Sequence, residues 1–83
     1  MHRFNIENAQ YRNDYKIFIT FDDGVEGVVD LKSFLLDQDC GVFARLRDKE
    51  EFKNFTVDGH TLTWGDDLDL APEFLRDLLM KKI

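Results

Sequence analysis

The sequence predicts an α+β domain: a small antiparallel sheet of two β-hairpins plus an N-terminal strand, with short helices and a C-terminal helix packed on it. Two Asp-Gly pairs, Asp23-Gly24 and Asp58-Gly59, each separate short runs rich in β-branched and aromatic residues, which is a strong signal for a hairpin. A segment beginning at Pro72 carries apolar residues at helical spacing. Because 83 residues suffice for one core, we expect a single domain over residues 1–83.

The first element expected is a short strand around Phe4 and Ile6, which alternate with polar residues. The following segment, Ala9–Asp14, is polar. We therefore predict that it is a connection to the first hairpin rather than part of a strand.

The first hairpin spans Tyr15–Leu31, and the segregation of its side chains predicts its register. A two-residue loop would place Ile17 opposite Asp30 and mix charge with apolar groups on one face. A three-residue loop, Asp22-Asp23-Gly24 with Gly24 left-handed, separates them. This loop pairs Phe21 with Val25, Ile19 with Gly27, Ile17 with Val29, Phe18 with Val28, Lys16 with Asp30 and Thr20 with Glu26.

Short helices are expected between the hairpins. Asp30 can cap a turn over Leu31–Leu36, and Val42–Arg47 has apolar residues at helical spacing. Asp48 followed three residues later by Glu51 is a capping box, which predicts the start of another short helix.

The second hairpin is expected to have a two-residue turn at Asp58-Gly59. The predicted pairs are Val57 with His60, Phe55 with Leu62, Lys53 with Trp64, Thr56 with Thr61 and Asn54 with Thr63. This register places apolar side chains on one face and threonines on the other, as in an antiparallel sheet with one buried side.

The C-terminal helix begins at Pro72, where the missing N–H of a first-turn proline costs nothing. The negative charge of Glu73 suits the N-terminal end of the helix dipole. Its apolar stripe consists of Phe74, Leu75, Leu78 and Leu79. A helix this short is marginal alone, so we expect the stripe to dock on the sheet.

The charge balance argues against several function classes. Seventeen acidic and 11 basic residues give a formal net charge of −6, which disfavours binding to nucleic acid and suits a basic protein partner. Cys40 is the only cysteine, so no intramolecular disulfide forms and a reducing, cytoplasmic location is expected. Neither a signal peptide nor a membrane span is expected, because apolar runs of the required length are missing.

Two series of residues form extended motifs. The first is the run Tyr15–Gly24 with Gly27 and Val29-Asp30-Leu31, and the second is Gly41-Val42-Phe43, Leu46-Arg47-Asp48, Phe52, Leu62-Thr63-Trp64 and Asp67–Leu75. Together they resemble, over Phe4 to Leu75, the small bacterial proteins grouped as domain of unknown function 2442. The most specific part is Trp64–Pro72, although Gly65-Asp66 stands where the family usually has a Pro-Asn-Gly-like turn.

The resemblance implies a compact α+β domain without an assigned catalytic activity, and it transfers no catalytic residue. It also implies a protein partner, because genes of this family commonly lie beside that of another small protein and some members are described as antitoxin-like. Longer members carry an additional helix-turn-helix domain. We expect none in these 83 residues, so the DNA binding of those members does not transfer.

Clustered carboxylates are the first candidate for a metal site: Asp66, Asp67, Asp69 and Glu73. They do not fit the calcium-loop pattern, since Pro72 stands where the sharp turn needs glycine. Cys40 and His60 could act as nucleophile and base, but acids beside Cys40 oppose formation of its thiolate. We therefore predict no catalytic residue, no metal site and no cofactor.

One predicted surface suits a partner. The first-hairpin register places Phe18 opposite Val28 on the face away from Ile17, and Lys16 and Glu26 lie at the edges of that apolar pair. The alternative is that Phe18 packs under the segment Val42–Leu46 and belongs to the core.

The leading hypothesis is a non-enzymatic interaction module, antitoxin-like or regulatory, that binds a small protein encoded nearby. The second is a small metal-dependent enzyme that uses the Asp66/Asp67/Asp69 cluster with His60. The third is a self-associating unit whose exposed edge, Phe4–Glu7, pairs with a second copy. We expect a monomer or a weak homodimer.

Overall fold

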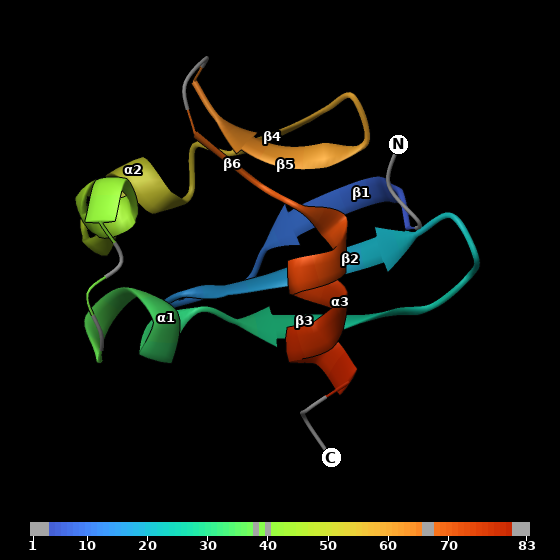
Figure 1. The fold of residues 1–83 in the computed structure, drawn as a ribbon, viewed down its shortest axis with the longest axis horizontal. Helices are drawn as coiled ribbons and strands as arrows, with labels where there is room; N and C mark the ends of the chain where they lie inside the picture. Colours follow the sequence, from blue (N-terminus) through green and yellow to red (C-terminus); the bar gives the residue numbers. More distant parts are fainter. Residues whose placement is uncertain (1–3, 38, 40, 66–67, 81–83) are drawn as a thin grey trace.

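The computed structural model describes residues 4–37, 39, 41–65 and 68–80 (Figure 1). Within this part of the chain, the elements follow in the order β1 (Ile6–Tyr11), β2 (Lys16–Phe21), β3 (Glu26–Asp30), α1 (Lys32–Leu36), the 3₁₀ helix η1 (Gly41–Arg47), α2 (Lys49–Phe52), β4 (Thr56–Asp58), β5 (Thr61–Trp64), β6 (Leu68–Leu70) and α3 (Pro72–Met80). The described strands form two antiparallel three-stranded sheets, ordered β1-β2-β3 and β4-β5-β6. The α+β fold class is confirmed, with its strands divided between two sheets.

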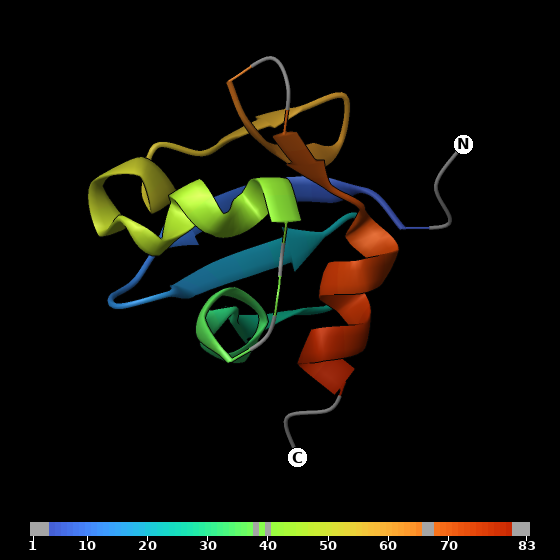
Figure 2. The same cartoon turned by 60° about the vertical axis from the view of Figure 1, so that its left-hand side comes forward.

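The second sheet lies beside β1, while α3 packs against β3 in the first sheet (Figure 1). The helices α1, η1 and α2 follow one another at the opposite end of the molecule from the β2–β3 loop (Figures 1 and 2). A single cluster of buried side chains joins all of these parts, and its members include Ile17, Ile19, Phe21, Val29, Leu35, Leu46, Phe52, Leu62, Trp64, Leu68, Leu70 and Leu75. Both sheets and the helices therefore share one core.

The predicted register of the first hairpin is confirmed at every strand pair, from Lys16 opposite Asp30 to Thr20 opposite Glu26. A backbone hydrogen bond closes the loop: the Phe21 N–H donates to the Val25 carbonyl at 2.9 Å. Gly24 has the predicted left-handed conformation, with φ at 92°. Glycine adopts this conformation without a steric penalty, so the three-residue loop fits its sequence.

Strand β1 is longer than predicted, and the assignment of Ala9–Tyr11 to a polar connection was wrong. The cause is an irregularity between Ile6 and Asn8, where the register with β2 shifts. A β-bulge of this kind changes which alternate residues face the core. Ile6 faces inward before the bulge, and Ala9 and Tyr11 pack against the core after it. Apolar and polar residues of β1 therefore do not alternate regularly in the sequence, because the bulge changes which residues face the core.

The predicted register of the second hairpin was wrong by two residues. Val57 lies opposite Leu62 and Asp58 opposite Thr61, so the turn consists of Gly59 and His60, with φ values of 61° and 69°. A two-residue turn of this type needs two consecutive left-handed residues, and the observed pair is Gly59 and His60 rather than Asp58 and Gly59. A shift of two residues preserves the faces, so the apolar side still points to the core.

The short helices follow local capping bonds. The Asp48 carboxylate accepts the Glu50 N–H at 3.0 Å and so caps α2 as predicted, and the Asp48 N–H donates to the Arg45 carbonyl at 3.3 Å. At the start of α1, the Asp30 carboxylate accepts the Lys32 N–H at 2.9 Å. The segment Val42–Arg47, which was predicted to be helical, belongs to the 3₁₀ helix η1, and its Leu46 is buried in the core.

Helix α3 forms where it was predicted, and it also joins distant parts of the chain. Its Leu75 is fully buried, and its Leu79 lies so close to β3 that a Cβ on Gly27 would be 3.1 Å from the Leu79 Cδ1. The Arg76 guanidinium pairs with Asp23 at 3.0 Å and stacks over the Phe4 ring at 4.4 Å. Strand β6, just before this helix, was not predicted, because three residues are too few to show alternation.

Candidate functional site

The side chains predicted to bind a partner share one face of the first sheet. We call this side, formed by alternate residues of β2 and β3, the outer face: Lys16, Phe18, Thr20, Glu26, Val28 and Asp30. Phe18 lies directly opposite Val28 at its centre. The Phe21–Val25 and Leu31–Tyr15 backbone bonds fix the phase of the ladder, so Phe18 and Val28 form a non-hydrogen-bonded pair. Side chains approach more closely in such a pair.

The helices cover the other side of this sheet. Ile17 and Ile19 are fully buried in the same cluster as Leu46 of η1, whereas Phe18 and Val28 are half-buried and outside that cluster. Val42, at the start of η1, is 72% exposed. The segment Val42–Leu46 and Phe18 therefore lie on different sides of the first sheet, and the alternative in which Phe18 packs under that segment is wrong.

Charged and polar groups surround the central pair. The Arg12 guanidinium carbon lies 4.8 Å from the centre of the Phe18 ring, a cation–π contact. The Thr20 hydroxyl lies 3.5 Å from a Glu26 carboxylate oxygen, and Lys16 faces Asp30 across the strands. The contact of Arg12 with Phe18 was not predicted from the sequence, because it depends on the unpredicted extension of β1 to Tyr11. The outer face thus has an apolar centre and a charged border.

The residues of the metal-dependent alternative are not brought together by the described part of the chain. Asp66 and Asp67 lie outside the described residues, as does Cys40. Asp69 is an exposed residue of β6 opposite Thr63, and His60 is an exposed turn residue rather than part of the apolar face of β5. Within the described ranges, no three His, Cys, Asp or Glu side chains are grouped to hold a metal ion.

The edge proposed for self-association makes bonds within the chain. The Ile6 N–H donates to the His60 carbonyl at 3.0 Å, and the Phe4 N–H donates to a Glu73 carboxylate oxygen at 3.4 Å. The Asp22 N–H also donates to the Asn5 carbonyl. Pairing of Phe4–Glu7 with a second copy would compete with these contacts.

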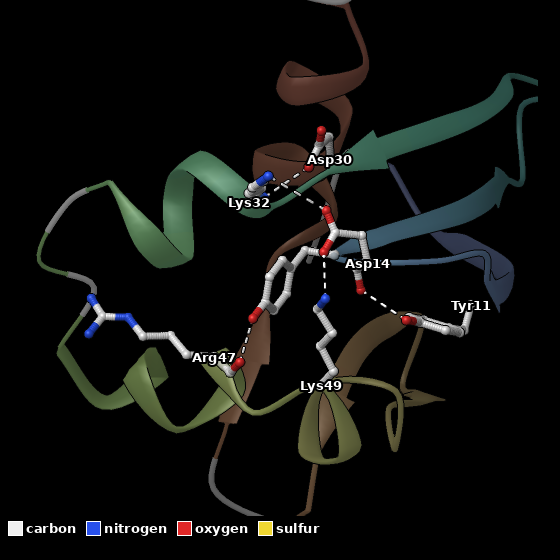
Figure 3. Close-up of polar contacts among 7 residues, drawn as sticks. Tyr11, Asp14, Asp30, Lys32, Arg47 and Lys49 are labelled. Carbon is white, nitrogen blue, oxygen red and sulfur yellow. Dashed lines mark hydrogen bonds and ion pairs between the residues drawn. The ribbon is translucent and has the colours of Figure 1, made fainter.

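A second polar cluster, missed in the sequence, surrounds Asp14 in the β1–β2 turn (Figure 3). Its carboxylate lies 3.0 Å from the Lys49 ammonium and 3.8 Å from that of Lys32, and its backbone carbonyl accepts the Tyr11 hydroxyl at 3.0 Å. The hydrogen bond from Lys49 holds the pKa of Asp14 below its usual value, although burial opposes this shift. The same bond raises the pKa of Lys49.

Figure 3 shows Asp14 between side chains from the beginnings of α1 and α2. Beside it, the Tyr15 hydroxyl donates to the Arg47 carbonyl, and the Arg47 Nε donates to the Leu35 carbonyl. The pKa shifts stabilise the charged forms of both Asp14 and Lys49, which suits ion pairing rather than proton transfer. The cluster therefore fastens the turn to two helices.

Comparison with known proteins identifies the family of this chain. The family model described as "Protein of unknown function (DUF2442)" matches residues 6–79, which is most of the chain. The chain belongs to this family, as its motifs indicated. No curated protein and no solved structure matches it significantly. In the described part of the chain, no helix is both long and apolar enough to cross a membrane.

Proposed function

We propose that this protein is a non-enzymatic interaction module whose outer face binds a small basic protein. The observation that carries the proposal is the Phe18–Val28 pair, which lies at the centre of a sheet face that the helices leave to the outside. An apolar centre bordered by polar groups is typical of the contact area of a small partner. Phe18 supplies a large aromatic surface, and aromatic side chains often contribute much of the binding energy.

The charge of the chain supports a basic partner. A formal net charge of −6 attracts a positively charged protein over distances of about a Debye length and raises the rate of encounter. The family's usual gene neighbourhood favours a small protein encoded nearby, so an antitoxin-like or regulatory role is the specific form of this proposal. A chain with one cysteine suits the reducing cytoplasm.

The Phe18→Asp variant tests the proposal, with Val42→Asp as its matched control. Both changes place a carboxylate on a partly or largely exposed apolar residue, but Val42 lies outside the outer face. We expect Phe18→Asp to remain folded, because it removes one cross-strand pair and one cation–π contact, together about 1–2 kcal/mol. It should lose binding to the product of the neighbouring gene, whereas Val42→Asp should keep it.

The measurement is co-purification followed by isothermal titration with the purified partner, and circular dichroism checks that each variant is folded. Equal binding by wild type and folded Phe18→Asp would refute the role of the outer face. The absence of any association with the neighbouring protein at micromolar concentrations would refute the basic-partner proposal itself.

A further inference from the structure

The outer face ends at a strand edge that has its own recognition pattern. Strand β3 is the last strand of the first sheet, and β2 is its single neighbour among the described strands. At the two ends of the β2–β3 ladder, the Phe21 N–H donates to the Val25 carbonyl and the Leu31 N–H donates to the Tyr15 carbonyl. Because hydrogen-bonding direction alternates along a strand, Gly27 and Val29 also face β2. The N–H and C=O groups of the intervening residues, Glu26, Val28 and Asp30, lie in the plane of the sheet and point away from β2.

The same three residues present their side chains on the outer face. From one end of β3 to the other, they form an acid–apolar–acid series of Glu26, Val28 and Asp30. The inner side of this strand is already occupied, since Gly27 lies against Leu79 of α3. An added strand would therefore bond to the β3 backbone and extend the outer face beyond Val28 by one further column of side chains.

Charge selects between two occupants of this edge. If a second copy paired its β3 antiparallel about Val28, Glu26 of each chain would lie opposite Asp30 of the other. Such a pair of strands would contain two like-charge contacts, and like charges directly opposite each other destabilise strand pairing. A strand with a basic, an apolar and a basic residue at alternate positions would instead complement all three side chains. The acidic residues thus oppose self-pairing and favour a basic strand.

We propose that the β3 edge binds an extended basic segment of a protein partner by adding it to the first sheet as a further strand. The partner's apolar side chain packs beside Val28 and continues the row that contains Phe18, while its two cations pair with Glu26 and Asp30. This inference rests on the proposed function, and it specifies the backbone mode of binding and the sequence pattern of the bound segment.

The wild-type protein provides the first test, by nuclear magnetic resonance with a capped peptide of sequence Ser-Arg-Thr-Val-Thr-Arg-Ser. We expect saturable shift changes along β3. Amide exchange of Glu26, Val28 and Asp30 should slow by about tenfold or more at saturation, because these N–H groups gain acceptors. The amides of Gly27 and Val29 bond to β2 already and serve as internal controls. Binding without slower exchange at the three outward amides would overturn the inference.

A charge-reversed peptide, with Glu in place of both Arg residues, tests the choice of partner. We expect it to bind about tenfold more weakly, which is the effect of two exposed ion pairs. Equal binding of the two peptides would overturn the basic pattern of the partner.

The Val28→Pro variant tests the backbone mode and is matched by Val28→Ala. Proline is tolerated on an edge strand where the N–H points away from the sheet, so the β2–β3 ladder keeps its bonds. We expect Val28→Pro to lose at least about tenfold in peptide affinity through the missing donor and Val28→Ala to lose about threefold. If Val28→Pro fails to fold by circular dichroism, the amide exchange of the wild type decides the question.

The two proposals fail in different ways. If the neighbouring protein binds wild type and folded Val28→Pro equally but does not bind Phe18→Asp, the outer face is a binding site and the edge inference is wrong. If neither substitution changes the binding of that protein, both the outer-face site and the edge are excluded.

Discussion

Replacing Trp64 by Phe tests how the second sheet is fastened to α2. The Trp64 indole N–H donates to the Phe52 carbonyl at 2.7 Å, and both residues are buried. Phe52 is the last residue of α2, so its carbonyl lies among those that have no partner within the helix. The Trp64→Phe substitution keeps an aromatic ring in the core but removes this donor. We expect it to destabilise the fold markedly.

The magnitude follows from two contributions. Leaving a buried carbonyl without its donor costs about 1–3 kcal/mol. Replacing the indole by the smaller phenyl ring removes roughly 40 Å² of buried apolar surface, or about 1 kcal/mol. The free energy of unfolding should therefore fall by about 2–4 kcal/mol. For a chain of 83 residues, this corresponds to a decrease of roughly 10–25 °C in Tm.

Urea and thermal denaturation followed by far-ultraviolet circular dichroism would measure the change, because Trp64 is the only tryptophan and its fluorescence is lost in the variant. Phe55→Leu is the control, since the Phe55 ring contacts the same indole at 6.3 Å. That half-buried side chain makes no comparable hydrogen bond, so we expect a loss of about 1 kcal/mol. A loss below about 1 kcal/mol for Trp64→Phe would refute the role assigned to its indole N–H.

Two further substitutions test the turns. The lowered pKa of Asp14, set first by its bond to Lys49, stabilises the fold above the ordinary value of 3.8 and ceases to do so as the pH falls through and below it. The difference in unfolding free energy between wild type and Asp14→Asn should therefore be constant near neutral pH and shrink below about pH 4; a pH-independent difference would contradict this ion pairing. Because His60 is left-handed, His60→Val should cost about 1–2 kcal/mol in urea denaturation and His60→Gly less than about 0.5 kcal/mol; a stabilising valine would contradict the observed turn.

Side-chain segregation made the first hairpin predictable. The three-residue loop keeps Ile17 and Ile19 apart from Asp30 and Glu26 whereas the two-residue loop does not, and the register with the three-residue loop also placed Phe18 opposite Val28. The second hairpin lacked this discrimination, since a shift of two residues leaves the same side chains on each face. The observed turn consists of Gly59 and His60, which the short-range Asp-Gly signal did not reveal.

Other features depend on contacts between distant segments. The bulge after Ile6 allows β1 to join the first sheet while its beginning bonds to the second hairpin, and local alternation cannot indicate such a change. The ion pairs of Asp14 with Lys32 and Lys49 likewise require three separate segments to meet. The outer face could be predicted from the sequence because its central pair, Phe18 and Val28, lies on two strands joined by a short loop.

The position of Arg76 has a consequence for the timing of folding during synthesis. It holds Asp23, which precedes it by 53 residues, and its guanidinium stacks on Phe4 still earlier in the chain. The first hairpin thus emerges from the ribosome long before α3 arrives to secure it. Contacts across so long a stretch of chain are slow to form, because a large loop must close first. Until then, Leu79 does not cover the inner side of β3 around Gly27, which is exposed to solvent.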